Sequence, residues 1–343
     1  MIDENMSIKK WRKNRAPRRI LIIRVQALGD LFITLPFVYD LKIKYPNAKI
    51  DLLVRTDYSM LPTQMNLFHQ IHTLRGGTVS WKQKVFMLGL IPKLWFTRYE
   101  VVLDLQRNRM TRWVRRLLLP KAWTEFDRFS PKSALIRTQW SINQVGLGSF
   151  EMNVDFSKHF TKNQHVQQIL EKNGWDGQSR LVILNPAGAF VTRNWDLARY
   201  GAFIKLWLSQ KPQTLFVILG ADKIAEKASF IKEKHPQQVI DLVGKTNLHQ
   251  AYEIVLKADF MLTEDSGLGH FSWISGKKTL MILGSTRSDW TKPFGQHTAS
   301  FDSSDLPCGD CMLATCLHDT LICLDRLTSE MVFESAWKLY TQP

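Results

Sequence analysis

Short uninterrupted apolar runs alternate with helix-length segments along this chain, and this alternation constrains its fold more than any other feature. The first run covers residues 20–23, a helical pattern follows over 31–41, and a second run covers 50–54. A continuous apolar run of this length is typical of a strand buried on both faces of a parallel sheet. The segment therefore predicts one β-α-β unit.

The same alternation returns at 101–103 and continues through the second half of the chain. The runs there are 181–184, 215–219, 239–242, 260–263 and 279–283, with helical stretches around 196–209, 222–234, 248–257 and 268–275. Strands that alternate with helices of this length imply parallel sheets with right-handed crossovers. A chain of 343 residues with 45% hydrophobic composition is long enough for two such domains.

We therefore predict an α/β protein with two Rossmann-like domains. A basic N-terminal extension covers 1–17, the first domain covers 18–165, and the second covers 166–328 with a cysteine-rich loop at 308–323. A final helix is expected over 329–343. Because ligands of open α/β sheets bind beyond the carboxyl ends of the strands, the loops 26–30, 185–195 and 264–270 are expected to face one crevice.

The turn at 264–270 follows an apolar run directly and leads into a predicted helix. Unpaired backbone N–H groups and the positive end of the helix dipole make such a turn an anion site. The alternative is a plain N-cap, with Asp265 or Ser266 accepting from nearby amides and His270 packed in the core. The phosphate-site interpretation includes Asp265, Ser266, Gly267, Leu268, Gly269 and His270.

The first loop ends in Gly29-Asp30, at the mouth of a helix that follows a buried strand. A carboxylate at this place can take a proton from a hydroxyl nucleophile. The alternative is that Asp30 only caps the helix. Gly29 is expected to provide a tight turn or a close backbone approach.

The second loop contains Gly188 and places Thr192 and Arg193 just before a helix. Arg193 has the fork geometry to hold a diphosphate, and small residues let backbone amides approach it. Asp222, after another strand, is predicted either to contact a nucleoside or to cap a helix. An arginine without a function remains the alternative for Arg193.

Positive charge is confined to one half of the chain. Residues 1–150 hold 26 Lys and Arg against 10 Asp and Glu, whereas residues 151–343 hold 20 against 21. This asymmetry indicates an anionic partner such as a nucleic acid, an acidic membrane or a phosphorylated substrate. The apolar stretch 85–96, flanked by Lys82, Lys84, Lys93 and Arg98, is typical either of an interfacial helix or of a core helix with solvated lysines.

All four cysteines lie close together in the sequence, as Cys308, Cys311, Cys316 and Cys323. The chain shows no N-terminal secretion signal and no apolar run long enough to span a membrane, so we expect a cytoplasmic location. Four thiols at this spacing predict a structural zinc site, with free thiols or disulfides as alternatives. Nothing in the sequence connects this site to the other loops.

Several ordered motifs together resemble glycosyltransferase family 9, the heptosyltransferase family of lipopolysaccharide assembly. The matching segments are 20–31, Thr34-Leu35-Pro36, Asn185-Pro186-Ala187-Gly188, Arg193-Asn194-Trp195, Leu219-Gly220, 242–248, 265–270 and 283–286. The resemblance spans roughly residues 18–337 and implies the two-domain GT-B fold. It implies that domain 18–165 binds the acceptor and that domain 166–328 binds a nucleotide-sugar.

By this resemblance, Asp30 matches the proposed catalytic base, Arg193 lies near the donor diphosphate, and 265–270 surround the phosphates and the proximal sugar. The donor would be ADP-heptose, transferred with inversion. No two aspartates are separated by a single residue, so the Asp-x-Asp metal clamp is absent and we expect catalysis without a metal or cofactor.

The resemblance also implies an anionic lipid-linked glycan acceptor, which suits the basic half. We expect a monomer in peripheral contact with the cytoplasmic face of the inner membrane, and no nucleic-acid partner. Two alternatives stay open. A GT-B-fold epimerase or nucleotide-sugar hydrolase would explain the second domain, and a nucleic-acid-binding protein would explain the basic half.

Overall fold

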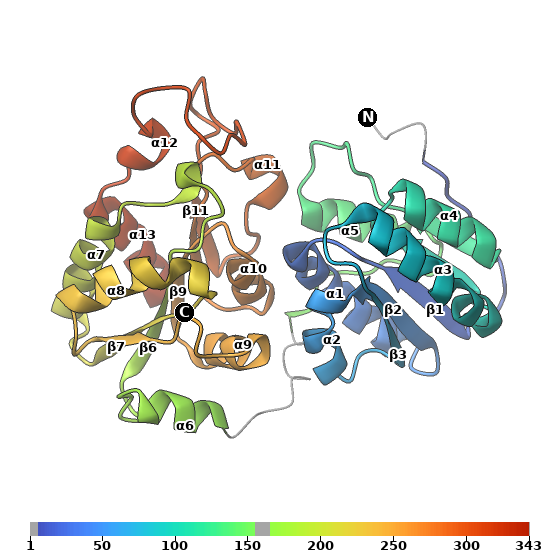
Figure 1. The fold of residues 1–343 in the computed structure, drawn as a ribbon, viewed down its shortest axis with the longest axis horizontal. Coiled ribbons are helices and arrows are strands. Elements are labelled where there is room, and N and C mark those ends of the chain that lie inside the picture. Colours follow the sequence, from blue (N-terminus) through green and yellow to red (C-terminus); the bar gives the residue numbers. More distant parts are fainter. Residues whose placement is uncertain (1–5, 155–164, 343) are drawn as a thin grey trace. The chain divides into compact units, whose positions relative to one another are not determined.

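The computed structural model describes residues 6–154 and 165–342. The chain divides into two compact units, Met1–Thr161 and Lys162–Pro343, each built on one parallel sheet with flanking helices (Figure 1). The predicted α/β class with two Rossmann-like domains is confirmed. The predicted boundary between residues 165 and 166 stays a prediction, because 155–164 lie outside the described residues.

The sheet of the first unit has the order β3-β2-β1-β4-β5, and its paired strands all run parallel. Its strands are β1 (Arg19–Ile23), β2 (Lys49–Arg55), β3 (Gln70–Leu74), β4 (Val101–Asp104) and β5 (Ala122–Glu125). Its helices are α1 (Leu28–Lys44), η1 (Thr56–Tyr58), α2 (Met60–Gln64), α3 (Ser80–Thr97), α4 (Arg109–Leu118) and α5 (Ala134–Asn143).

Alternate residues of the central strand β1 point to opposite faces of this sheet. Leu21 and Ile23 belong to a buried cluster with Met87 of α3 and Val114 of α4, so these two helices cover one face. Helices α3 and α4 also pack against each other, and so do α1 and α5. The burial of both sides of β1 is the reason for its unbroken apolar sequence.

Part of the predicted extension 1–17 adds to this unit. Lys9 forms an antiparallel bridge to Trp123 of β5, and the N–H of Trp11 donates to the carbonyl of Val145 at 2.7 Å. Trp11 is itself buried. The described residues of the extension therefore follow the outer edge of β5, while residues 1–5 lie outside the described residues.

The sheet of the second unit has the order β11-β10-β9-β6-β7-β8. Its strands are β6 (Arg180–Asn185), β7 (Thr214–Ile218), β8 (Val239–Asp241), β9 (Phe260–Glu264), β10 (Thr279–Ile282) and β11 (Thr298–Phe301). Its helices are α6 (His165–Lys172), η3 (Val191–Arg193), α7 (Leu197–Gln210), η4 (Asp222–Ile224), α8 (Ala225–Lys234), α9 (Leu248–Lys257), α10 (Gly267–Ile274), α11 (Ser288–Thr291), α12 (Ile322–Asp325) and α13 (Ser329–Thr341).

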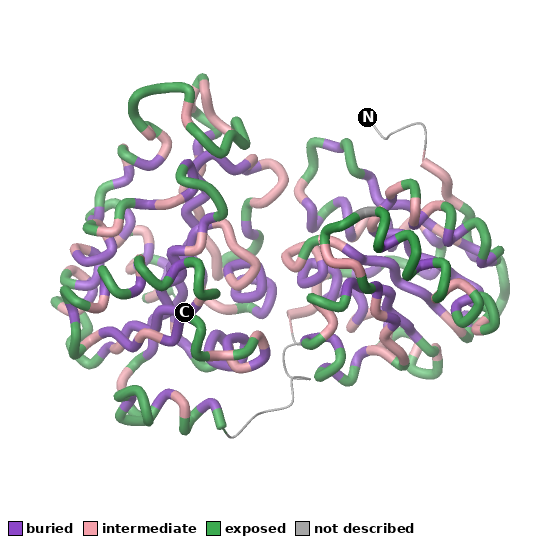
Figure 2. Tube along the Cα trace, viewed as in Figure 1, coloured by how far each residue is buried: buried purple, intermediate pink, exposed green. Residues whose placement is uncertain are grey.

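The predicted final helix is observed as α13, which packs on α7 of the same unit. Val332 and Ala336 of α13 join Trp207 in the buried core. Burial follows the strands in both units, as the purple segments of Figure 2 show.

Three observed strands were not predicted from the sequence: β3, β5 and β11. Each lies at an edge of its sheet. An edge strand is covered less completely, so its sequence does not need a continuous apolar run. The burial of β3 and β11, which alternates or stays intermediate along the strand, agrees with this explanation.

Candidate functional site

In the second unit, β6, β9 and β10 are neighbours in the sheet, so the loops that follow them lie together. Asn185, the last residue of β6, connects them. Its amide oxygen accepts from Thr263 Oγ1 at 2.9 Å and from Ser266 Oγ at 2.6 Å, and its amide nitrogen donates to the carbonyl of Leu219 at 2.6 Å. One buried side chain therefore joins the ends of β6 and β9 to the segment after β7.

The N-terminus of α10 has a defined cap. Ser266 is the N-cap, and its hydroxyl and carbonyl accept from the N–H groups of Gly269 and His270 at 3.0 and 3.1 Å. Within residues 6–154 and 165–342, the N–H groups of Gly267 and Leu268 have no hydrogen-bond partner. The cap and the anion site are therefore compatible, because the cap uses two amides and leaves two available.

Gly269 is required by packing at this turn. A Cβ at this position would lie 2.8 Å from Thr263 Cγ2, closer than real contacts allow. The helix therefore begins directly against the end of β9. This close approach places its first amides at the carboxyl edge of the sheet.

Asp265 is held by three side chains. Its carboxylate lies 3.0 Å from Nη1 of Arg193 and 3.5 Å from Nε2 of His270, and it accepts from Thr286 Oγ1 at 2.8 Å. Burial raises the pKa of this carboxyl, but the three partners outweigh burial and hold the pKa below its usual value. Asp265 thus orients Arg193 and His270, and its own charge does not favour an anion.

Arg193 is buried, with 7% of its surface exposed. Its Nη2 lies 3.4 Å from the sulfur of Met312, and its guanidinium lies 4.8 Å from the ring centre of Phe190. Among the described residues its buried Nε has no hydrogen-bond partner. A buried donor without a partner is costly, so this nitrogen suits an incoming anion.

The ring of His270 has a fixed tautomer. Its Nδ1 accepts from the indole N–H of Trp273 at 3.1 Å, and an indole nitrogen can only donate. The ring proton therefore lies on Nε2, which faces Asp265. His270 is therefore both packed against Trp273 and directed at Asp265, so the two interpretations that the sequence left open for it are compatible.

Glu264, the last residue of β9, closes the loop after β6. Its carboxylate accepts from the N–H groups of Gly188 and Trp195 at 2.7 and 2.8 Å and from the hydroxyl of Tyr200 at 3.2 Å. Burial raises the pKa of Glu264 to about 7, against the effect of these hydrogen bonds. A Cβ at Gly188 would lie 2.4 Å from the carbonyl oxygen of Arg193, so only glycine fits this turn.

Sequence reasoning did not assign a role to Glu264 or to Lys227. Lys227 of α8 donates to the carbonyl of Pro186 at 3.0 Å and to Asn194 Oδ1 at 2.7 Å, and lies 4.0 Å from Glu264. Burial lowers the pKa of Lys227. The position of Glu264 at a strand end was a usable signal, but nothing in the sequence around Lys227 pointed to the loop.

Thr192 contacts the cysteine-rich loop. Its hydroxyl donates to the carbonyl of Leu313 at 2.5 Å and lies 2.9 Å from Ser285 Oγ. The N–H of Met312 donates to the carbonyl of Ser285 at 2.8 Å, and the carboxylate of Asp310 accepts from the N–H and hydroxyl of Ser288. Segment 310–313 therefore forms one wall of the candidate site, a connection that the sequence did not reveal.

The four cysteines around this wall are free thiols. Burial raises the pKa of Cys323, and the neighbouring thiols Cys316, Cys311 and Cys308 raise it further. In the part of the chain that the structure describes, no group of three or more His, Cys, Asp or Glu is arranged to hold a metal ion. The zinc site stays a prediction.

Asp222 lies at the start of η4, after β7. Neither η4 nor α8 shows a side-chain cap at its start, so the capping alternative for Asp222 is not observed. Its carboxylate packs on Gly244, where a Cβ would lie 1.8 Å from Asp222 Oδ1. The nucleoside contact of Asp222 stays a prediction.

In the first unit, Asp30 lies in the first turn of α1 with its side chain 37% exposed. One carboxylate oxygen lies 3.0 Å from Nη2 of the buried Arg24, and the other accepts from the N–H of Ala27 at 3.3 Å. Asp30 therefore has the contact of a helix cap and also presents an exposed carboxylate. Gly29 lies in the first turn of α1 without a positive φ, and its predicted role in a turn or a close backbone approach stays a prediction.

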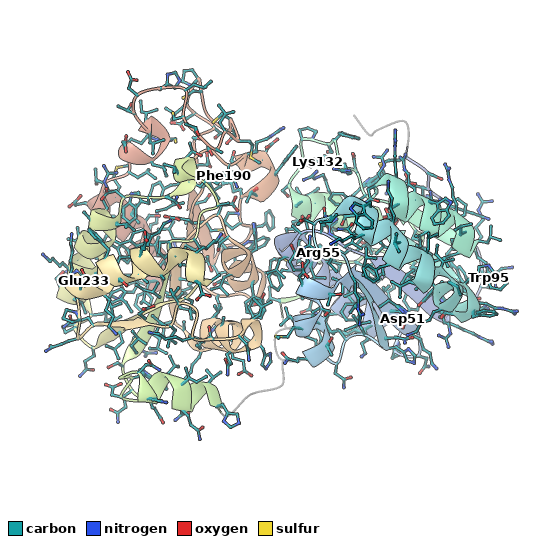
Figure 3. All side chains as sticks on the ribbon, in the orientation of Figure 1. Asp51, Arg55, Trp95, Lys132, Phe190 and Glu233 are labelled. Carbon is teal, nitrogen blue, oxygen red and sulfur yellow. The ribbon has the colours of Figure 1, made fainter. Side chains whose placement is uncertain are left out.

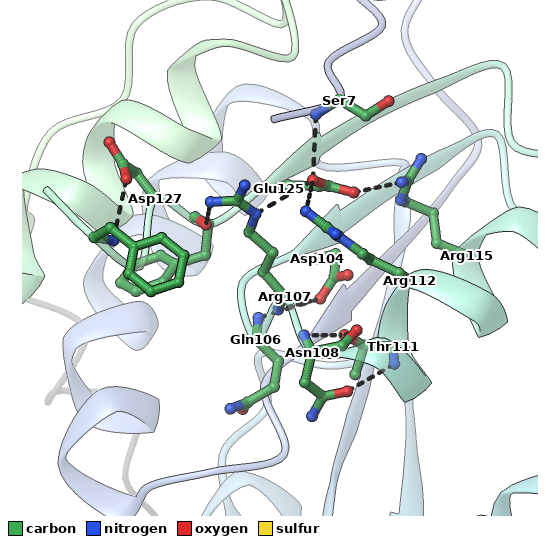
Figure 4. A network of polar contacts seen from close by, with 12 residues as sticks. Ser7, Asp104, Gln106, Arg107, Asn108, Thr111, Arg112, Arg115, Glu125 and Asp127 are labelled. Carbon is green, nitrogen blue, oxygen red and sulfur yellow. Dashed lines mark hydrogen bonds and ion pairs between the residues drawn. The ribbon is translucent and has the colours of Figure 1, made fainter. Parts of the chain in front are cut away.

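Arginines and buried acids cluster at the carboxyl ends of β4 and β5 (Figure 4). Asp104 accepts from the N–H of Arg107 at 2.9 Å, and Glu125 lies 2.5 Å from Arg115 Nη2 and 3.4 Å from Arg107 Nε. Burial raises the pKa of Asp104 to about 6. This end of the sheet, where Arg24 and Asp30 also lie, is rich in fixed cations.

Each unit thus has a parallel sheet with charged and amide groups at the carboxyl ends of its strands, and in the second unit a capped helix N-terminus lies at that edge. This combination is that of an α/β protein of the GT-B class. The family model described as glycosyltransferase family 9 (heptosyltransferase) matches residues 90–322. The chain belongs to this family.

Curated relatives and solved structures agree with this membership. Lipooligosaccharide heptosyltransferase 2 of Campylobacter jejuni is 31% identical over 179 residues, which are 50% of this chain and 54% of that protein. The chain thus spans about half the length of this relative. Lipopolysaccharide heptosyltransferase 3 of Escherichia coli is 20% identical over 297 residues, 81% of this chain and 86% of that protein.

Two solved structures show the same fold. The family 9 glycosyltransferase of Veillonella parvula has a TM-score of 0.74 at 16% identity and covers 94% of this chain and 97% of its own. The E. coli heptosyltransferase WaaC, solved with ADP-2-deoxy-2-fluoro heptose, has a TM-score of 0.70 at 17% identity and covers 93% of this chain and 99% of its own.

Proposed function

We propose that this chain is an inverting glycosyltransferase that transfers a heptose from ADP-heptose to an anionic, lipid-linked acceptor in the synthesis of the lipopolysaccharide core. The observation that carries the donor half is that the N–H groups of Gly267 and Leu268 have no partner among the described residues and follow directly after Asp265 and Ser266, with Asp265 paired to the buried Arg193. The named relatives are heptosyltransferases, and WaaC was solved with an ADP-heptose analogue.

The donor diphosphate would lie against the N-terminus of α10. The two free amides and the helix dipole bind the phosphate oxygens, and Arg193 donates through Nε, which Asp265 leaves available. These groups are already oriented before the reaction. They therefore stabilise the charge that develops on the leaving nucleoside diphosphate.

On the acceptor side, Asp30 would take the proton of the attacking hydroxyl. Its exposed carboxylate can reach a substrate, and the ion pair with Arg24 holds the carboxylate in place. Attack from the face opposite the diphosphate inverts the anomeric configuration. The roles of Asp30 and Arg193 are both parts of this proposal.

Catalysis without a metal is part of the proposal, because fixed protein groups supply the positive charge that a metal supplies elsewhere. Arg193, the helix dipole of α10 and the nearby Lys227 are the candidates in the second unit. The fixed arginines of the first unit, Arg24 and Arg107 among them, favour an acceptor with phosphate or carboxylate groups.

The decisive experiment combines binding and transfer. Calorimetry should show ADP-heptose binding to the full chain more tightly than UDP- or GDP-sugars, and transfer to a phosphorylated lipid A–Kdo acceptor should give an anomer of inverted configuration by NMR. Transfer should persist with chelator present. Release of free sugar or formation of an epimer from the nucleotide-sugar alone would instead identify a hydrolase or an epimerase.

A further inference from the structure

The outer side of α3 has an unusual composition for a helix that covers a sheet. Such a helix is normally apolar toward the sheet and polar toward water. In α3 the residues toward the sheet, Met87 and Leu94, are fully buried, as expected. The opposite side is also apolar and is between 42% and 74% exposed at Trp81, Val85, Phe86, Leu88, Trp95 and Phe96.

Helix α4 continues this surface, because it packs beside α3 on the same face of the sheet. Trp113 and Leu117 of α4 are 45% and 37% exposed, and Leu119 just after it is 78% exposed. We call the exposed sides of the two helices together the α3–α4 face. Figure 3 shows Trp95 at the outer border of the first unit, and Figure 2 shows exposed residues along α3.

The exposed charges of the two helices and of the residues that flank them in the chain have one sign. Neither helix contains an aspartate or glutamate, and between residues 76 and 121 the sequence has only two acids, Glu100 and Asp104, which are 8% and 0% exposed. The same segment contains ten lysines and arginines. Those exposed at the surface of the two helices and at their ends are Lys82, Lys84, Lys93, Arg98, Arg109 and Arg116.

A basic cavity adjoins the C-terminal end of α4. It has a volume of about 820 Å³ and is lined by the N-terminal segment, including Lys9, Lys10 and Lys13, and by Lys121, two residues after Leu119. Lys121 lies 2.9 Å from the buried Glu100, while Lys10 and Lys13 are exposed. The positive surface therefore continues beyond the helices.

We propose that the α3–α4 face docks the protein on an anionic lipid bilayer. The rings and aliphatic side chains enter the layer between the headgroups, and the surrounding lysines and arginines bind lipid phosphates. Residues 6–154 and 165–342 contain no helix that meets the length and hydropathy of a membrane span. The acceptor proposed above is lipid-linked, but the surface that meets the lipid follows from this face alone.

Bilayer docking explains the face better than binding to nucleic acid does. The phosphates of a nucleic acid would suit the lysines, but Val85, Leu88 and Leu117 would find no apolar partner there. A bilayer offers hydrocarbon to the apolar side chains of this face and phosphates to the lysines and arginines that surround them. Binding to a nucleic acid or to an acidic protein is an outcome of the test.

The test is flotation of the full chain with vesicles of phosphatidylcholine, with and without phosphatidylglycerol. The chain should float with the anionic vesicles and remain free with the neutral ones. W95S/F96S should weaken partitioning by about tenfold, from the apolar area that no longer enters the lipid. K82Q/K84Q should weaken it by about fivefold for each lysine and by less at high salt.

The matched control is F230S on α8 of the second unit. Phe230 is 37% exposed, and its ring centre lies 4.0 Å from Nζ of Lys234. It should bind vesicles as the parent chain does. Equal binding to neutral and anionic vesicles would overturn the proposal. Unchanged binding of W95S/F96S would overturn it as well, because the chain would then only adsorb by charge.

A duplex oligonucleotide that displaces the protein from vesicles, with W95S/F96S binding it normally, would assign the face to nucleic acid. If an acidic protein displaces the chain from vesicles in the same assay, the face would be assigned to a protein partner instead. Transfer to a soluble acceptor without acyl chains separates this test from the enzyme proposal. The variants of the α3–α4 face should retain this transfer. The docking proposal is therefore tested by vesicle binding alone, whatever the result of the transfer assay.

Discussion

Each unit has an aspartate at a turn from a strand into a helix, and the two aspartates have different surroundings. In the first unit, the turn from β1 to α1 places Asp30 in the first helical turn, 37% exposed, with Nη2 of Arg24 3.0 Å from its carboxylate. In the second unit, the turn from β9 to α10 places Asp265 among Arg193, His270 and Thr286. The N–H groups of Gly267 and Leu268, which follow in the chain, have no partner among the described residues.

The difference shows what decides the role of a carboxylate at such a turn. Asp265 is surrounded by Arg193, His270 and Thr286, which hold its pKa below the usual value and occupy its carboxylate. Asp30 keeps an exposed carboxylate and is free to meet a substrate. The surroundings of Asp30 thus fit the proposed base, and the surroundings of Asp265 fit the proposed site for an anion.

The largest effect is expected for Asp30→Asn. The amide cannot take the proton of the acceptor hydroxyl, so kcat should fall by between about a hundredfold and ten-thousandfold while the Kd for ADP-heptose stays unchanged. Asp40→Asn, in the same helix with a contact to the N–H of Glu151, is the control and should keep kcat. A D30N enzyme with near-normal kcat would remove Asp30 as the base.

Arg193→Ala should have the next largest effect, on the donor instead of the acceptor. The loss of a charged donor to the diphosphate should weaken ADP-heptose binding by between about tenfold and a hundredfold in calorimetry. Arg180→Ala, which removes an exposed arginine paired with Asp259, is the control. Unchanged donor affinity in R193A would show that the anion does not bind at α10.

The two units should also differ in how their stability depends on pH. Burial raises the pKa of Glu264 to about 7 and that of Asp104 to about 6, so each binds its proton more tightly when folded. The free energy of unfolding should therefore fall as the pH rises from about 4.5 to about 7 for Glu264, by up to about 3 kcal/mol.

Glu264→Gln should remove this fall in the free energy of unfolding of the second unit. Asp104→Asn should remove the corresponding fall in the first unit, which occurs at lower pH and ends near pH 6. Urea titrations at several pH values, with a probe in each unit, measure both. Identical slopes in E264Q and the parent chain would contradict the assignment of this titration to Glu264.

The smallest effect is expected for Thr192→Val. It removes the hydroxyl that holds Leu313 of the cysteine-rich loop and should weaken donor binding by about fivefold, the value of one hydrogen bond. If the four thiols bind zinc, metal analysis should find it, and its removal by a chelator should act in the same direction. Thr298→Val, on the edge strand β11, is the control.

Much of the fold was predictable because it depends on local pattern. The central strands were found from their apolar runs, and Ser266 was correctly weighed as a cap, since both signals lie within a few residues. The edge strands β3, β5 and β11 were missed because none of them has an unbroken apolar run. In β3 and β11 this agrees with partial burial, whereas β5 is mostly buried and still contains Thr124 and Glu125.

The candidate residues were found in part for the same reason. The site residues of both turns follow strand ends, which the sequence shows. Lys227 was missed because it lies in the middle of α8, where its reach to Pro186 depends on the packing of that helix. The exposure of Trp95 and Phe96 also needed the structure, since the sequence pattern fitted a core helix equally well.

The sequence by itself determined the α/β class, the strand-to-helix turns and the resemblance to the family. Only the tertiary structure decided which side chains meet. Arg193 pairs with Asp265 across 72 residues, Gly188 with Glu264 across 76, and Thr192 with Leu313 across 121. Periodicity encodes which residues are buried, but partners at these separations depend on the order of strands in the sheet, which no local pattern contains.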